Sequence, residues 1–303
     1  MVKRTRADVI FDTINVALMV VILIIVIYPL YFTLIASFSD PTQVSLGNTA
    51  LWIKDFTLEP YANVFKNSDI WLGYRNTIFY TVFGTCWNLL LTLPTAYVLS
   101  KKELPGRSGL SWYFLFTMYF SGGLIPTYLT VLKLGLVNRP VTIVILGGLS
   151  IYNMIVSRIY FQNSIPNELY EAAKIDGASD FCQFFRIALP LSAPIIAVIA
   201  LYYGVGRWND YFTALIYLND NKYVPLQIVL RNILIQNQGM SNMLTQEQLM
   251  ANEEMREYYD RMKHMAEGMK YSIIYIASAP LLIAYPFVQK YFVKGVMIGS
   301  LKG

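Results

Sequence analysis

The chain has 303 residues, of which 55% are hydrophobic and 14% are charged, and its mean hydropathy is +0.44. Because soluble domains carry about 25% charged residues, this composition excludes an ordinary soluble protein and indicates that lipid solvates much of the surface. The net charge of +5 is attributed to membrane topology, and it gives no basis for predicting nucleic-acid binding.

Six stretches are long and apolar enough to cross a bilayer, which takes about 20 residues. They are residues 12–38, 76–100, 110–131, 140–161, 191–218 and 271–292. The first is predicted to be a retained anchor, because its apolar run is longer than that of a signal peptide and no A-x-A-like cleavage site follows it. The sequence therefore predicts an all-α membrane protein with a six-helix transmembrane domain over residues 12–292.

The distribution of Lys and Arg predicts the orientation of these helices. Basic residues are concentrated in short segments on one side, which include 1–11, 162–190 and 293–303, whereas the longer loops on the other side also carry many acidic residues. By the positive-inside rule, the N-terminus, the loop 162–190 and the C-terminal tail are cytoplasmic. The segments of about 39–75 and 219–270 are then external.

Signatures of catalysis and metal binding are missing from the sequence. Cys86 falls in a predicted span and Cys182 in a cytoplasmic loop, so no disulfide is expected between them. His264 is the single histidine and lies in an external loop, where no cluster of metal ligands accompanies it. The chain also has neither a phosphate-binding GxxxxGK[ST] loop nor a nucleophile elbow. We therefore expect a protein that is not an enzyme, binds no metal or cofactor, and takes its energy from elsewhere.

The loop 162–190 contains "YEAAKIDGASDFCQFFRIALP", a charged stretch between two apolar runs. Pro166 suits the first turn of a helix, and Gly177 can end that helix through a left-handed residue. Ser179 is a suitable N-cap for a second helix, which is predicted to stop before Pro190. Helices this short are unstable alone, so the pair is expected to pack either on its own helix bundle or in a groove of another protein.

This loop resembles the EAA loop of the permease subunits of bacterial ABC importers. The pattern is matched by Glu171, Ala172, Ala173, Gly177, Ile187, Leu189 and Pro190. The stretches "NTIFYTVFGTCWNLLLTLPTAYVLSKKELPGR", "GLVNRPVTIVIL" and "PFVQKYFVKGVMIGSLKG" are similar to the smaller, six-span permease of maltose-type importers. The stretch "FSGGLIPTYLTVLKLGLVNRP" and the long external insert depart from the maltose pattern. They resemble a Gram-positive branch associated with oligosaccharides or larger glycans, which points away from maltose.

The resemblance implies a type I ABC importer permease fold in the bacterial cytoplasmic membrane. It implies a coupling helix that sits in a cleft of the ATPase subunit and that includes Glu171, Ala172, Ala173, Asp176, Gly177 and Ala178. The family's C-terminal tail, which reaches toward the ATPase, corresponds to Gly299, Ser300, Leu301, Lys302 and Gly303. The implied partners are a second permease, two copies of an ATPase that binds ATP and Mg, and an extracellular solute-binding lipoprotein.

Polar and aromatic side chains within the spans are candidates for the transport pathway. Arg207 and Asp210 lie three residues apart, which favours an ion pair on one helix, with cavity lining or a latch to a partner helix as alternatives. Sugar sites combine aromatic faces with amide or hydroxyl groups. The residues of these types that could contact a carbohydrate are Tyr202, Tyr203, Asn209, Tyr119 and Tyr128.

The second half of the external segment 219–270 is rich in helix formers. The predicted helix either covers the rim of the bundle or offers a docking surface to an extracellular partner. Three alternatives to oligosaccharide import stay open. They are a related permease for a peptide or polyamine, an ATP-independent carrier, and a membrane enzyme, in decreasing order of support from the sequence.

Overall fold

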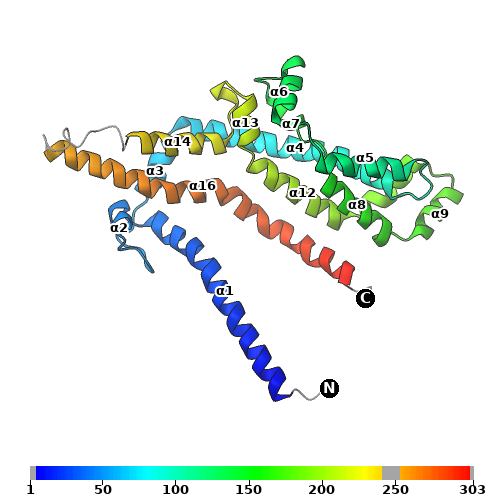
Figure 1. Ribbon diagram of the computed structural model, residues 1–303, viewed down its shortest axis with the longest axis horizontal. Coiled ribbons are helices and arrows are strands. Elements are labelled where there is room, and N and C mark those ends of the chain that lie inside the picture. The colour runs from blue at the N-terminus through cyan, green and yellow to red at the C-terminus, as the bar shows by residue number, and fades with distance from the viewer. Residues whose placement is uncertain (1–4, 241–252, 301–303) are drawn as a thin grey trace. The chain divides into compact units, whose positions relative to one another are not determined.

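The computed structural model describes residues 5–240 and 253–300, and within these ranges the chain is helical and has no strand. This confirms the predicted all-α class. The helices are α1 (Arg6–Phe38), α2 (Pro41–Ser45), α3 (Glu59–Phe65), α4 (Ser68–Ser100), α5 (Arg107–Tyr119), α6 (Leu124–Lys133), α7 (Pro140–Ile145), α8 (Ile151–Ser164), α9 (Asn167–Ile175), α10 (Asp180–Gln183), the π-helical turn η1 (Phe184–Ala188), α11 (Leu189–Leu191), α12 (Ala193–Trp208), α13 (Phe212–Tyr217), the 3-10 turn η2 (Asn221–Tyr223), α14 (Leu226–Met240) and α16 (Glu253–Ser300) (Figure 1).

The chain divides into two compact units. Unit 1 comprises Met1–Ser68 and Leu230–Ser278, and unit 2 comprises Asp69–Val229 and Ala279–Gly303. Both functional regions described below lie in unit 2.

Unit 1 contains α1, whose apolar side chains are largely exposed along most of its length. Thr5 and Asp8 form a capping box at its start, and the hydrogen bonds from Thr5 lower the pKa of the Asp8 carboxyl. Near its other end, Phe38 stacks on Phe56 and Tyr61. A helix with so much exposed apolar surface requires lipid or another apolar partner around it.

The start of α2 packs against the first part of α16 within unit 1. A Cβ added to Gly268 would lie 2.7 Å from Cγ of Pro41, so only glycine permits this close approach. The segment from Glu253 to Lys270 is helical, which agrees with the predicted external helix, while residues 241–252 lie outside the described residues. The preceding α14 was not predicted.

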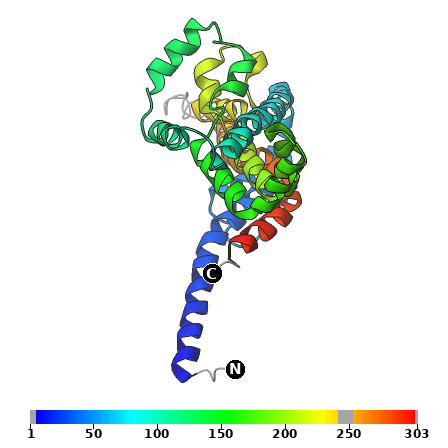
Figure 2. The same cartoon turned by 90° about the vertical axis from the view of Figure 1, so that its right-hand side faces the viewer.

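Among the described residues, two helices, α1 and α4, are long and apolar enough to cross a membrane. The number rises to four if α5 with α6, and α10–α11 with α12, are each counted as one bent span. The bends are 108° and 82°, respectively, and Figure 2 shows α5 and α6 as separate rods. Thus residues 110–131 do not form the continuous helix that was predicted, because Gly123 turns the chain with φ of 82°. The count of six spans stays a prediction.

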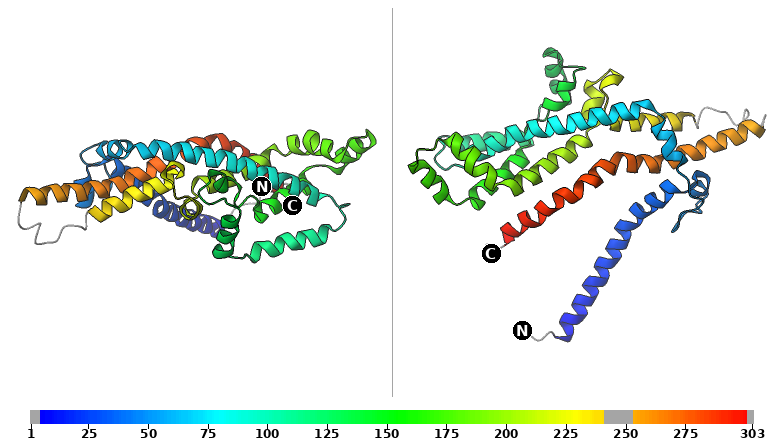
Figure 3. Two further views of the ribbon diagram at one scale, coloured as in Figure 1. Left: turned by 90° about the horizontal axis from the view of Figure 1, so that it is seen from above. Right: turned by 180° about the vertical axis from the view of Figure 1, so that it is seen from behind.

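The core of unit 2 is built where α4 runs beside α8 and α12 (Figure 3). At one end, Tyr97 of α4 contacts Phe161 of α8 and Phe184 of η1, with ring centroids 5.8 and 5.0 Å apart. At the other end, a Cβ on Gly73 would lie 2.9 Å from Cα of Leu226. The first of these contacts packs the segment after α8 against the end of α4, and the second packs the start of α14 against the start of α4.

Candidate functional site

The first candidate region is residues 166–191 of unit 2, which follow α8 and are named the coupling hairpin after their predicted role (Figures 1 and 3). Its first helix, α9, ends as predicted at Gly177, whose φ is 75°. The N–H of Gly177 donates to the Lys174 carbonyl at 3.1 Å, and the N–H of Ala178 donates to the Ala173 carbonyl at 2.8 Å. This pair of hydrogen bonds is a Schellman motif, which satisfies carbonyls at the helix end and reverses the chain.

The second helix of the hairpin starts as predicted but does not end as predicted. Ser179 is its N-cap, and the Ser179 hydroxyl accepts from the N–H of Cys182. The helical path does not stop before Pro190, however, but continues through η1 into α11. Pro190 is the second residue of α11 and directly follows the π-helical turn. The chain turns instead after Ser192, at the start of α12.

The predicted coupling residues lie on α9 and in the turn that follows it, where they form a mostly exposed surface of the hairpin. Four of them are exposed, namely Glu171, Ala172, Asp176 and Gly177, and the other two, Ala173 and Ala178, are half-buried. Ala172 lies on the face of α9 opposite Tyr170, which packs inward against the core around Tyr97.

Three apolar side chains beside this surface were not predicted to belong to the site. Ile175 is 86% exposed, Phe181 76% and Leu169 42%, although all three lie in a charged, hydrophilic loop. Apolar residues in such a loop, spaced around a short helix, were the signal that could have identified them. The hairpin therefore presents apolar side chains together with charged ones.

The second candidate region is the α7–α8 break, residues 146–150, where non-helical backbone interrupts the fourth predicted span. The Arg207 guanidinium on α12 closes the end of α7. It donates to the carbonyl oxygens of Ile143 at 2.7 Å, Val144 at 3.2 Å and Leu146 at 2.8 Å, and its Nε donates to Oδ1 of Asn88 at 3.0 Å. A cation at a helix C-terminus satisfies carbonyls that the helix itself leaves unpaired.

Asn88 on α4 completes the same network and is fully buried. Its Nδ2 donates to the carbonyls of Gly147 and Gly148, each at 2.8 Å. The Arg207 side chain passes directly over Gly84, where a Cβ would lie 2.9 Å from the arginine Nε. Because lipid offers no hydrogen bonds, irregular backbone at membrane depth requires such protein partners.

Tyr203 on α12 fixes the far side of the break. Its hydroxyl accepts from the N–H of Ser150 at 3.0 Å and lies 2.7 Å from the hydroxyl of Thr92. Asp210, for which the sequence favours an ion pair with Arg207, accepts instead from the N–H of Thr213 at 3.1 Å. Arg207 is therefore a latch between helices.

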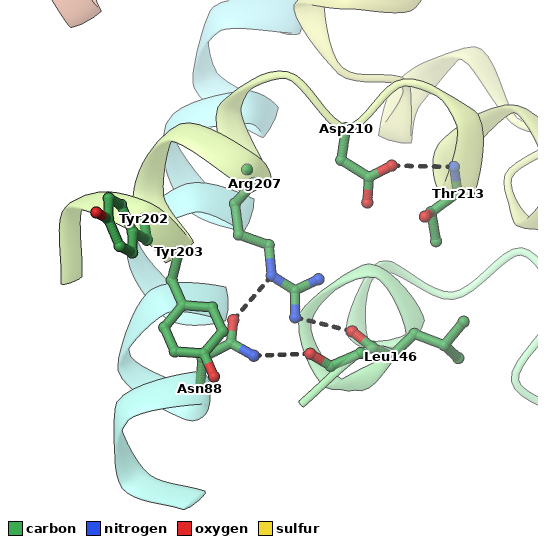
Figure 4. A pocket seen from close by; sticks show the side chains of 9 residues that line it. Asn88, Leu146, Tyr202, Tyr203, Arg207, Asp210 and Thr213 are labelled. Carbon is green, nitrogen blue, oxygen red and sulfur yellow. Dashed lines mark hydrogen bonds between the residues drawn. The ribbon is translucent and has the colours of Figure 1, made fainter. Parts of the chain in front are cut away.

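A pocket of about 320 Å³ opens beside this network (Figure 4). Its lining comprises Asn88, Leu146, Gly147, Tyr202, Tyr203, Gly206, Arg207, Asp210 and Thr213. Asn88 and Thr213 escaped the sequence prediction. Asn88 could have been identified from the sequence, because a polar residue within an apolar helix often has a structural or functional role.

The five predicted sugar contacts are not brought together. Tyr202 and Tyr203 line the pocket, but the Asn209 amide donates to the Val205 carbonyl of its own helix at 2.9 Å and is absent from the lining. Tyr119 is 77% exposed on α5, and Tyr128 stacks on a tyrosine of α13. These last three lie outside the pocket.

The predicted tail contact is covered only in part. Gly299 and Ser300 form the last described turn of α16, and Leu301, Lys302 and Gly303 lie outside the described residues. Across the described ranges, no group of three or more His, Cys, Asp or Glu side chains is placed to hold a metal ion.

Comparison with known proteins identifies the family. Residues 70–298 match the family described as "Binding-protein-dependent transport system inner membrane component". The chain is 39% identical to "Protein LplC" of Bacillus subtilis over 99% of this chain and 97% of that protein. It is 37% identical to "Polygalacturonan/rhamnogalacturonan transport system permease protein YtcP" of the same organism, over 97% and 98%.

A solved structure agrees with these relatives. The chain superimposes with a TM-score of 0.83 and 32% identity, over 96% of this chain and 100% of the other, on a chain of a bacterial ABC transporter involved in the import of the acidic polysaccharide alginate. The fold is accordingly that of a type I ABC importer permease. This chain therefore belongs to the family of binding-protein-dependent transport system inner membrane components, and it is the permease component of an ABC transporter rather than an enzyme.

Proposed function

We propose that this chain is one of two permease subunits of an ABC importer that takes up an oligosaccharide through the bacterial cytoplasmic membrane. The observation that carries the proposal is the exposed coupling hairpin, which ends in a Schellman turn at Gly177. An exposed apolar surface on a short, sharply terminated helix suits insertion into a cleft of another protein.

The surface that would enter an ATPase subunit is the face of α9 opposite Tyr170. Ala172 gives this face little bulk, Ile175 gives it an apolar contact, and Glu171 lies at its edge. The remaining coupling residues are Ala173, Asp176, Gly177 and Ala178. ATP and Mg would bind to two ATPase subunits, and the residues 299–303 would reach toward the same subunits.

In the proposed arrangement the chain has six spans with both termini in the cytoplasm, and a second permease subunit forms the other half of the pathway. A solute-binding lipoprotein would dock on the external side, where unit 1 presents the beginning of α16. Closure of the ATPase subunits would move the coupling hairpins and shift the membrane domain between inward-facing and outward-facing states, because the hairpin makes different contacts in each.

The proposed substrate is an oligosaccharide that contains uronic acids. Two of the similar proteins are named for polygalacturonan, rhamnogalacturonan and alginate, which are acidic glycans. The pocket beside Arg207 offers an aromatic ring from Tyr202 and a hydroxyl group from Thr213, which suit a sugar ring. Fragments of polygalacturonate and alginate are therefore the first substrates to test, with neutral oligosaccharides, a peptide and a polyamine as competitors.

The test is uptake into proteoliposomes that contain both permeases and the ATPase, with the binding protein added outside. Uptake of a labelled uronate oligosaccharide is expected only with internal ATP, and Glu171→Lys is expected to abolish it while the permease pair still assembles. Lys54→Glu, on an external loop, provides a charge-changing control that should transport normally. Uptake without ATP would favour a carrier, and uptake of a peptide or polyamine instead would refute the sugar assignment.

A further inference from the structure

The coupling helix α9 is attached to the core of unit 2 through a single aromatic side chain. None of its residues is fully buried, and Tyr170 is its member that packs on the core around Tyr97. The ring centroids of Tyr97 and Tyr170 are 6.1 Å apart, and those of Tyr97 and Phe184 are 5.0 Å apart. The inner side of the hairpin thus rests on the last turn of α4.

Lys101, the residue directly after α4, places its ammonium group over the rings of Tyr170 and Tyr97. Its Nζ lies 3.1 Å from the centroid of the Tyr170 ring and 4.7 Å from that of Tyr97. We call these two rings, Phe184 and Lys101 the aromatic clamp. A partly desolvated ammonium over an aromatic face is attracted by the ring quadrupole. Burial lowers the pKa of Lys101, whereas Glu103 and Asp180 oppose that shift, and burial raises the pKa of Tyr170 to about 12.

The backbone that carries Lys101 is held firmly. Its N–H donates to the Val98 carbonyl at 3.2 Å, and the carbonyl of Ser100 accepts from the Gln162 amide on α8 at 3.3 Å. The Leu99 carbonyl accepts from Nε of Arg107 at 2.9 Å. The backbone of Lys101 is therefore fixed by hydrogen bonds, and its ammonium group contacts α9, which has no fully buried residue.

We propose that Lys101 is a positioning residue for energy coupling, which ties α9 to the end of α4 and passes the movement of the hairpin to that span. The inference rests on the proposed function, since it assigns a role within ATP-driven transport. Replacing Lys101 with methionine keeps the length of the side chain and its packing but removes the charge. Without the Lys101 contact, the packing of Tyr170 is what remains to hold α9 on the core, and the helix can pivot between Ile165 before it and Phe184 after it.

The neighbouring Lys102 provides a matched control because it is exposed and lies over neither ring. The reconstituted importer would be measured for substrate taken up per ATP hydrolysed. Lys101→Met is expected to lower this ratio about fivefold, the effect of losing one partly desolvated cation–π contact. Lys101→Arg, Lys102→Met and Tyr170→Phe are expected to keep the wild-type ratio, and Tyr170→Leu is expected to lower it as Lys101→Met does.

A second readout does not depend on activity. In a Cys86→Ser background, Cys182 on α10 is the single thiol of the chain and reports on the hairpin in the permease pair without ATPase. Lys101→Met is expected to raise its rate of maleimide labelling about fivefold, since local opening follows the same lost contact. The faster labelling should be reversed in Lys101→Arg.

The outcomes separate the two proposals. If the wild-type importer shows no ATP-driven uptake, the proposed function fails, and the coupling role of Lys101 fails with it. If the wild type transports but Lys101→Met keeps both its coupling ratio and its labelling rate, the positioning role is overturned and the proposed function stands. A Lys101→Arg variant as impaired as Lys101→Met would also overturn it, because the charge would then not be the cause.

Discussion

The coupling hairpin and the α7–α8 break are two turns of unit 2 in which the backbone N–H and C=O groups find hydrogen-bond partners in different ways. The hairpin uses local devices, since Gly177 and Ser179 provide its turn and its cap. The break uses distant side chains, since Arg207 and Asn88 supply hydrogen bonds from two other helices. A turn in water needs few partners, whereas a turn at membrane depth needs protein ones. Substitutions at the break should therefore lower the free energy of unfolding, whereas substitutions at the hairpin should lower ATP-driven uptake.

The largest loss of stability is expected from Arg207→Met, which leaves the carbonyls of Ile143, Val144 and Leu146 without their donor. The free energy of unfolding in mixed micelles should fall by about 3 kcal/mol, because each buried unsatisfied acceptor is costly. Arg139→Met, at the exposed start of α7, is the matched control and should change it little. Equal losses in the two variants would contradict the assignment of Arg207 as a latch.

Asn88→Leu tests the other half of the network with a side chain of similar size. The carbonyls of Gly147 and Gly148 lose their donors, and a fall of about 2 kcal/mol in the free energy of unfolding is expected. Asn209→Leu removes an amide that bonds only to its own helix and should be nearly neutral. If the Asn88 variant is as stable as the wild type, the break does not depend on side-chain donors.

Gly84→Ala tests how closely Arg207 crosses α4. The added methyl group would lie 2.9 Å from the arginine Nε, so a loss of about 1–2 kcal/mol is expected despite the better helix propensity of alanine. Gly109→Ala, where no atom lies within 4 Å, should be neutral or stabilising in the same unfolding measurement. A Gly84→Ala variant more stable than the wild type would show that the arginine can move aside.

Gly177→Ala separates stability from transport. Alanine in a left-handed conformation costs about 1 kcal/mol, and Gly106→Ala should cost the same, because its φ is 72° and it too has open space around it. Only the Gly177 variant should lose ATP-driven uptake in proteoliposomes. Equal uptake by the two variants would remove the hairpin from the coupling mechanism.

Ile175→Ser should have the smallest effect on folding. The side chain is 86% exposed, so the free energy of unfolding should change by less than about 0.5 kcal/mol. Co-purification of the ATPase subunit should nevertheless fall sharply, because an apolar contact at the centre of the proposed interface is lost. Unchanged co-purification would place the interface elsewhere. Ile53→Ser, in the loop between α2 and α3, is the control for exposed apolar residues.

The sequence predicted the hairpin better than the break for a physical reason. Gly177 and Ser179 act on groups within a few residues of themselves, so their roles can be inferred from local spacing. Arg207 and Asn88 are 119 residues apart, and nothing near either residue indicates the other. The same limit explains why Arg207 was paired with its sequence neighbour Asp210, and why the bend within the third predicted span, residues 110–131, was not foreseen.

The π-helical turn η1 has a consequence for the length of the chain between α10 and α12. A single-residue deletion within an ordinary α-helix rotates everything beyond it by about 100°, which would turn apolar faces away from their partners. A π turn holds one residue more than an α turn in the same stretch of helix. The turn Phe184–Ala188 therefore contains one residue more than an α-helical turn needs. Deleting one of these residues should convert the π turn into an α turn, and the hairpin and α12 should keep the surfaces through which they pack.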